Sequence, residues 1–124
     1  MGWKIEIYRA FFVAFGAMEL LSNLSYLLSV NGIQKSRKQH KELPQTVNDN
    51  NLKIKIVFML LFGVAFLSAG LSSYILHQPM NVLNTSVLII FAIYACMEAL
   101  FYKYIRTTGF AVISIIFLLI YLGV

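Results

Sequence analysis

Charge, cysteine and histidine are scarce in this 124-residue chain. Charged residues make up 12% of it, against roughly 25% in ordinary globular proteins. The single cysteine, Cys96, excludes an intramolecular disulfide and a thiolate metal cluster. The two histidines, His40 and His77, are far apart and form no metal-ligand motif, and neither is expected to serve a membrane glutamate. We therefore expect no metal site and no cofactor.

The motifs of the common enzyme classes are also missing. The sequence has no Gly-x-Ser-x-Gly elbow, no His-Glu-x-x-His zinc motif, no glycine-rich phosphate loop and no paired-cysteine redox motif. The net charge of +5 comes from basic residues clustered between apolar stretches, which indicates membrane topology rather than nucleic-acid binding. We expect no catalytic residue and no nucleic-acid partner.

Apolar residues are what the chain has in abundance. They make up 60% of it, compared with about 45–50% in a soluble domain. Four apolar stretches, at about 10–30, 54–76, 85–104 and 108–124, have the length of membrane spans or come close to it. The sequence predicts an all-α fold with one domain, residues 1–124, that is a small bundle of four transmembrane helices.

The basic residues predict the orientation of this bundle. Eight of the ten lie in or beside the first and third connections, and only Lys4 and Arg9 lie near the N-terminus. The positive-inside rule then places loops 31–53 and 105–109 in the cytoplasm and both termini outside, in the cytoplasmic membrane. Within the first loop, the run from Asn48 to Asn51 is typical of a turn or loop.

Two glutamates lie inside apolar stretches with matching surroundings. Residues 12–21 and 91–100 share the pattern Phe-x-x-aromatic-small-small-Met-Glu-x-Leu, with Glu19 and Glu98 at the same position. Both segments cross the membrane in the same direction, so they form a parallel internal repeat of spans 1 and 3. Duplication and chance both explain such a short match. A carboxylate in hydrocarbon costs roughly 2.5 kcal/mol or more, so each needs a partner or a function.

Glu19 belongs to the most polar helical face in the chain. With it, Gly16, Ser22, Asn23 and Tyr26 fall on one stripe at helical spacing. Lipid cannot satisfy such a stripe, so it must face other helices or water. It could line a small polar path for a proton or cation, or it could supply hydrogen bonds between helices.

Glu98 has a different neighbourhood. Tyr94 and Tyr102 lie one turn away on either side, and their hydroxyls can donate to a carboxylate. Lys103 and Arg106 follow closely, which predicts an ion pair with a basic side chain that snorkels towards the interface. If Glu98 meets Glu19 in the bundle, the two could instead share a proton or hold a cation between them.

The first connection carries a basic cluster made of Lys35, Arg37, Lys38 and Lys41. These side chains could contact anionic lipid headgroups or an acidic partner, or they could determine topology alone.

Two functions fit these features. The first is a non-catalytic accessory, regulatory or immunity-type subunit that packs against a larger membrane partner. The second is a small transporter or channel, a homo-oligomer that uses Glu19 and Glu98 as a proton or cation site. Four short spans with a glutamate in the first are similar in size and in that residue to the small multidrug resistance transporters. The long first loop and the second glutamate depart from that pattern.

Overall fold

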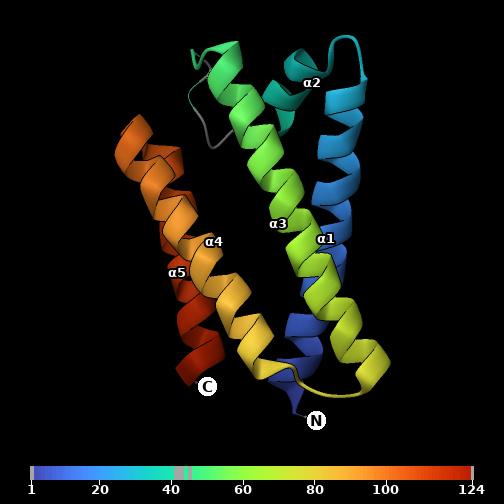
Figure 1. Cartoon of the computed structure of the whole chain (residues 1–124). Coiled ribbons are helices and arrows are strands. Elements are labelled where there is room, and N and C mark those ends of the chain that lie inside the picture. Colours follow the sequence, from blue (N-terminus) through green and yellow to red (C-terminus); the bar gives the residue numbers. More distant parts are fainter. Residues whose placement is uncertain (1, 41–43, 45, 124) are drawn as a thin grey trace.

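The computed structural model describes residues 2–40, 44 and 46–123. Five helices form in this part of the chain: α1 (Trp3–Leu28), α2 (Gly32–Gln39), α3 (Asp49–Leu76), α4 (Asn81–Tyr102) and α5 (Ile105–Gly123) (Figure 1). The described part holds no strand, so the all-α prediction is confirmed. Helices α1, α3, α4 and α5 are long and apolar enough to cross a membrane, which supports the prediction of four spans.

The helices begin earlier than their apolar segments. Helix α1 starts at Trp3 rather than near residue 10, and α3 starts at Asp49 rather than at residue 54. Helix α4 covers 81–102 instead of 85–104, and α5 begins at Ile105. Hydropathy marks only the segment that suits hydrocarbon, whereas backbone hydrogen bonding continues through the polar residues at its ends.

The run from Asn48 to Asn51 is not a turn or loop, so that prediction is wrong. Asn48 is the N-cap of α3, and its side chain accepts a hydrogen bond of 2.8 Å from the backbone N–H of Asn51. Asparagine is among the preferred N-cap residues because its side-chain oxygen satisfies a free amide of the first turn. The first connection is therefore not only a loop, since it contains α2 and the start of α3.

The other two connections are short. His77 and Met80 bound the α3–α4 link, and Lys103 begins the α4–α5 turn; all three have φ near +50°. This left-handed conformation ends or redirects a helix within one residue. The two termini of the chain lie at one end of the bundle, and α2 lies at the other end together with the α4–α5 turn (Figure 1). We call the second of these the basic end.

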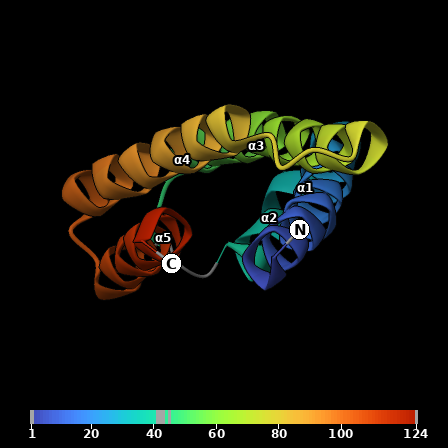
Figure 2. The same cartoon turned by 90° about the horizontal axis from the view of Figure 1, so that it is seen from below.

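The four long helices form two layers. Viewed along the bundle, α3 and α4 make one layer and α1 and α5 the other (Figure 2). A close contact joins the layers where Gly16 of α1 meets Gly63 of α3; a Cβ at Gly16 would lie 2.4 Å from the backbone nitrogen of Leu67. Small residues allow helix backbones to approach this closely in membranes.

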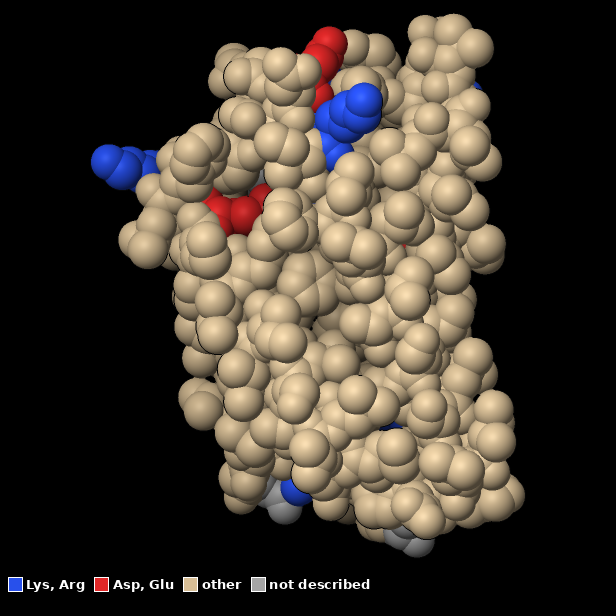
Figure 3. All heavy atoms as spheres, in the orientation of Figure 1, with Lys and Arg blue, Asp and Glu red and all other residues tan. Residues whose placement is uncertain are grey.

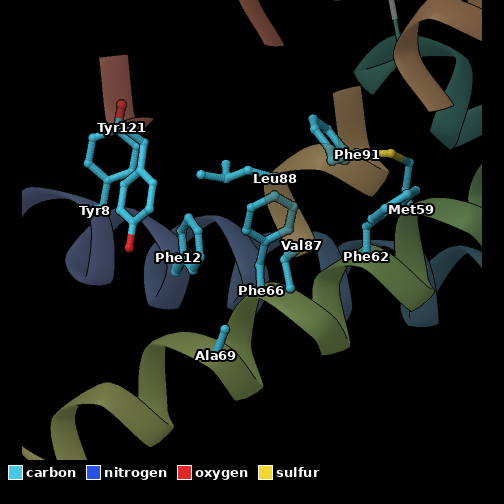
Figure 4. Packing of buried hydrophobic residues seen from close by; sticks show 10 residues of the cluster. All are labelled: Tyr8, Phe12, Met59, Phe62, Phe66, Ala69, Val87, Leu88, Phe91 and Tyr121. Atoms are coloured by element: carbon cyan, nitrogen blue, oxygen red, sulfur yellow. The ribbon is translucent and has the colours of Figure 1, made fainter. Parts of the chain in front are cut away.

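Aromatic rings fill the centre of the bundle. Phe12, Phe66 and Phe91 come from three different helices, and each is at most 8% exposed. The ring centres of Phe12 and Phe66 are 4.9 Å apart, and those of Phe66 and Phe91 are 5.2 Å apart, both edge-to-face. Towards the termini, Tyr8 stacks on Phe117 and donates to its carbonyl at 2.6 Å. The ring of Tyr8 also lies beside that of Tyr121 (Figure 4). Helices α1 and α5 touch there and diverge towards the basic end (Figure 1).

Candidate functional site

The polar stripe of α1 faces inwards. Glu19 is 4% exposed and Asn23 is fully buried. The side-chain amide of Asn23 donates to a carboxylate oxygen of Glu19 at 2.8 Å and to its backbone carbonyl at 2.7 Å. Ser22 and Tyr26 are half-buried at the edge of the stripe. Lipid is thus kept from the most polar atoms of the helix, as the burial argument requires.

Helix α2 folds back over this stripe and closes it. The side-chain amide of Gln39 donates to the carboxylate of Glu19 at 3.4 Å, and its oxygen, Oε1, accepts from the hydroxyl of Tyr26 at 2.5 Å. Nε2 of His40 lies 3.1 Å from Oδ1 of Asn23, an arrangement in which the ring N–H donates to the amide oxygen. The side chains of Glu19, Asn23, Tyr26, Gln39 and His40 therefore form one hydrogen-bonded network, here called the α1–α2 network.

A glycine makes this fold-back possible. Gly32 is the first residue of α2, and a Cβ at that position would lie 1.6 Å from the backbone oxygen of Tyr26. Any larger residue would push α2 away from α1. On its other side, α2 is tied to the first turn of α3 by an ion pair of 2.6 Å between Arg37 and Asp49.

Glu98 is found in a different interaction. Its carboxylate pairs at 2.5 Å with the ammonium group of Lys55 on α3; Lys55 is 1% exposed and Glu98 is 7% exposed. An ion pair was expected, but with the wrong partner: in the described part of the chain, none joins Glu98 to Lys103 or Arg106. Lys55 reaches further into the bundle because it faces α4 from within a span, whereas Lys103 and Arg106 are exposed beside the turn.

Aromatic rings surround the buried ammonium group. The Nζ atom of Lys55 is 4.8 Å from the ring centre of Phe110 and 5.2 Å from that of Tyr94. Such cation–π contacts stabilise a desolvated cation by about 2 kcal/mol or more. Tyr94 therefore supports the charge of Lys55, rather than acting only as the predicted donor to Glu98. Tyr102 is half-buried beside the same pair.

A recess of about 330 Å³ lies over this pair, between α3 and α4. Ile54 and Phe58 on α3 line it together with Met97 and Phe101 on α4, and all four side chains are exposed. Figure 3 shows this face of the molecule, with charged atoms gathered near the two ends and acidic atoms visible in a hollow near the basic end. The recess is therefore an apolar groove with two opposite charges at its floor.

The two repeated segments correspond in burial but not in partners. Corresponding positions are buried in both helices: Phe12 and Phe91, Gly16 and Ala95, Glu19 and Glu98; Met18 and Met97 are exposed in both. Yet amides of α1 and α2 bind Glu19, and a lysine of α3 binds Glu98. The partners of the two carboxylates thus differ, and a shared proton or cation stays a prediction.

The basic cluster lies on and beside α2. Lys35 and Lys38 are exposed, and Arg37 is half-buried in its pair with Asp49. Lys41 lies outside the described residues. In the described part of the chain, no group of three or more His, Cys, Asp or Glu residues could hold a metal ion.

Sequence reasoning missed three residues that contact the glutamates or Asn23: Gln39, His40 and Lys55. His40 was expected to be poorly placed to serve a glutamate; its ring lies at Asn23, whose amide binds Glu19. Helix α2 brings the loop back onto α1, which hydropathy cannot show. The buried ion pair of Lys55 could have been predicted from the sequence, since a lysine inside an apolar span needs a buried partner. No family model, curated protein or solved structure matches this chain.

Proposed function

We propose that this chain is a non-catalytic membrane subunit of the accessory, regulatory or immunity type, and that it docks onto a larger membrane partner through α2. The observation that supports this is the way α2 is held. The α1–α2 network binds it from one side and the Arg37–Asp49 pair from the other, while Lys35 and Lys38 stay exposed. A rigid basic helix favours recognition of an acidic protein surface, because its charges occupy defined positions.

The positions of the two carboxylates also favour this function over transport. Glu19 is bound by amides and Glu98 by a lysine, so both have local partners. Between them and the termini lies the aromatic centre around Phe12, Phe66 and Phe91. A path for protons or cations requires polar groups or water at that depth. The described side chains there are apolar apart from Ser114, whose hydroxyl donates to the backbone carbonyl of Phe110 at 2.9 Å.

The alternative is a small oligomeric transporter or channel coupled to protons or cations. The recess over Lys55 and Glu98 is the observation that favours it, because it brings a buried carboxylate next to an open groove. A second copy of the chain would have to complete a polar path past the aromatic centre.

Site-specific crosslinking tests the docking proposal. A photoreactive residue replaces the exposed Gln34 of α2, and adducts are compared in native membranes for two doubly charge-reversed variants. We expect one discrete protein adduct that is lost in Lys35→Glu/Lys38→Glu and kept in Lys103→Glu/Arg106→Glu, which reverses two exposed charges at the same end. Equal loss in both variants, or adducts with lipid alone, would contradict the proposal.

A further inference from the structure

We propose that the recess between α3 and α4 binds the headgroup of a zwitterionic phospholipid with a primary ammonium group. The recess has apolar walls and a floor that carries both signs of charge, Lys55 and Glu98. This inference is independent of the docking of α2, because the two surfaces share no residue.

The depth of the ion pair matches that of a headgroup. Lys55 is six residues after the first residue of α3, and Glu98 is four residues before the last residue of α4. At a rise of 1.5 Å per residue, the two lie roughly 9 Å and 6 Å inside the helix ends. The polar layer on each side of the hydrocarbon core is roughly 5–8 Å thick. The pair therefore lies near the boundary at which phosphates and amines meet the acyl chains.

The charges of the recess select the class of lipid. Lys55 would attract an anionic headgroup, but Glu98 would repel it. A cationic headgroup would be attracted by Glu98 and repelled by Lys55. A zwitterion gains from both, with its phosphate at Lys55 and its ammonium group at Glu98. A carboxylate has about four acceptor sites and an ammonium group three donors, so neither group is limited to a single hydrogen-bond partner.

Hydrogen bonding separates an ethanolamine headgroup from a choline headgroup. A primary ammonium group can donate to the carboxylate of Glu98, but a quaternary ammonium group has no N–H to donate. A hydrogen bond between two charged groups is stronger than one between neutral groups. We therefore expect phosphatidylethanolamine to bind about tenfold more tightly than phosphatidylcholine or phosphatidylglycerol.

The walls of the recess fit the rest of such a lipid. Ile54, Phe58, Met97 and Phe101 are exposed and apolar. They can contact the upper part of an acyl chain that continues along the groove between α3 and α4. Tyr102 also lines the recess, and its aromatic ring suits the interfacial depth.

Native mass spectrometry of the protein released from nanodiscs tests this. The nanodiscs contain equal parts of phosphatidylethanolamine, phosphatidylcholine and phosphatidylglycerol, and the retained lipid is identified. We expect phosphatidylethanolamine to be retained about tenfold over each of the others. Lys55→Met/Glu98→Gln should abolish this selectivity, whereas the charge-swapped Lys55→Glu/Glu98→Lys should keep it. Equal retention of the three lipids by the unmodified protein would overturn the proposal.

Two controls keep the result interpretable. Arg37→Gln/Asp49→Asn removes an ion pair from the same end but not from the recess, and we expect it to retain the lipid. Helix content confirms that every variant is folded. A phosphatidylethanolamine with a photoreactive group near its headgroup should label residues that line the recess. Selectivity that survives in Lys55→Met/Glu98→Gln, labelling only elsewhere, or a recess crosslinked to a second copy of the chain would each contradict the proposal.

Discussion

Lys55 and Glu98 lie on facing helices, and each makes the other tolerable in a membrane. Together with the rings of Tyr94 and Phe110, they replace water as the environment of two buried charges. A buried pair of this kind contributes little net stability compared with an apolar pair, but removing one partner leaves an uncompensated charge.

The first prediction follows from this asymmetry. Lys55→Met alone should lower the free energy of unfolding by about 3–5 kcal/mol, because it leaves Glu98 buried without its lysine. Adding Glu98→Gln should restore most of that loss. The measurement is unfolding in a detergent mixture, followed by helical circular dichroism. A double variant that is less stable than Lys55→Met would contradict the account.

Asn23 carries the second prediction. Its side chain joins Glu19 to His40, so Asn23→Ala leaves buried polar groups unsatisfied at a cost of about 1–3 kcal/mol. We expect α2 to be released and trypsin to cleave faster after Lys35 and Lys38. Ser25→Ala, at an exposed position of the same helix, is the control. Equal cleavage rates in the two variants would show that the network does not hold α2.

For single residues, the sequence predicts burial more accurately than it predicts contact partners. The helical stripe placed Glu19 and Asn23 on an inward face correctly. The partners Gln39, His40 and Lys55 lie 17 to 43 residues away along the chain. Hydrophobic periodicity reports the face of a helix but not which other face it meets.

Helices α1 and α3 show how small residues control packing between elements. Spacing of alanine and serine along the spans suggests close packing, and Ala69 and Ser73 are fully buried. The two backbones also come close together at Gly16 and Gly63, where a single methyl group would meet backbone atoms. These glycines could have been paired from the sequence only if α1 and α3 were already known to be neighbours.

The third prediction concerns this contact. Gly16→Ala should lower stability by about 1–3 kcal/mol, because the helices must separate to admit the methyl group. Gly109→Ala is the matched control, since a Cβ there has open space within 4 Å. That substitution should raise stability by about 0.5–1 kcal/mol through helix propensity. Thermal unfolding in detergent measures both, and a neutral Gly16→Ala would contradict the close packing.

Helix α2 was not predicted because Ile33 is the one large apolar side chain among its eight residues, so it has no apolar stripe of its own. Its position comes from tertiary hydrogen bonds and from Gly32 rather than from local pattern. The start of α3 at Asp49 had a readable signal in the asparagine before it, which serves as an N-cap. The abundance of Asn and Asp there favoured the turn interpretation.

The whole molecule has its termini at one end and its basic connections at the other (Figure 1). An even number of spans requires this arrangement, and charge asymmetry predicts that the basic end is cytoplasmic.

Cysteine labelling in intact cells gives the fourth prediction. In a Cys96→Ala background, Gln78→Cys and Gln34→Cys place exposed thiols at opposite ends of the bundle. A membrane-impermeant maleimide should label position 78 directly and position 34 only after permeabilisation. The reverse pattern would invert the orientation.

The central claim is that both membrane glutamates have structural partners and do not serve a transport path. Proton and monovalent cation flux into liposomes that contain the purified protein tests this most directly. Glu19→Gln and Glu98→Gln are measured beside the unmodified protein. We predict that flux stays at the level of protein-free liposomes in all three preparations. Flux in the unmodified protein that disappears in either variant would contradict the claim and establish the transporter.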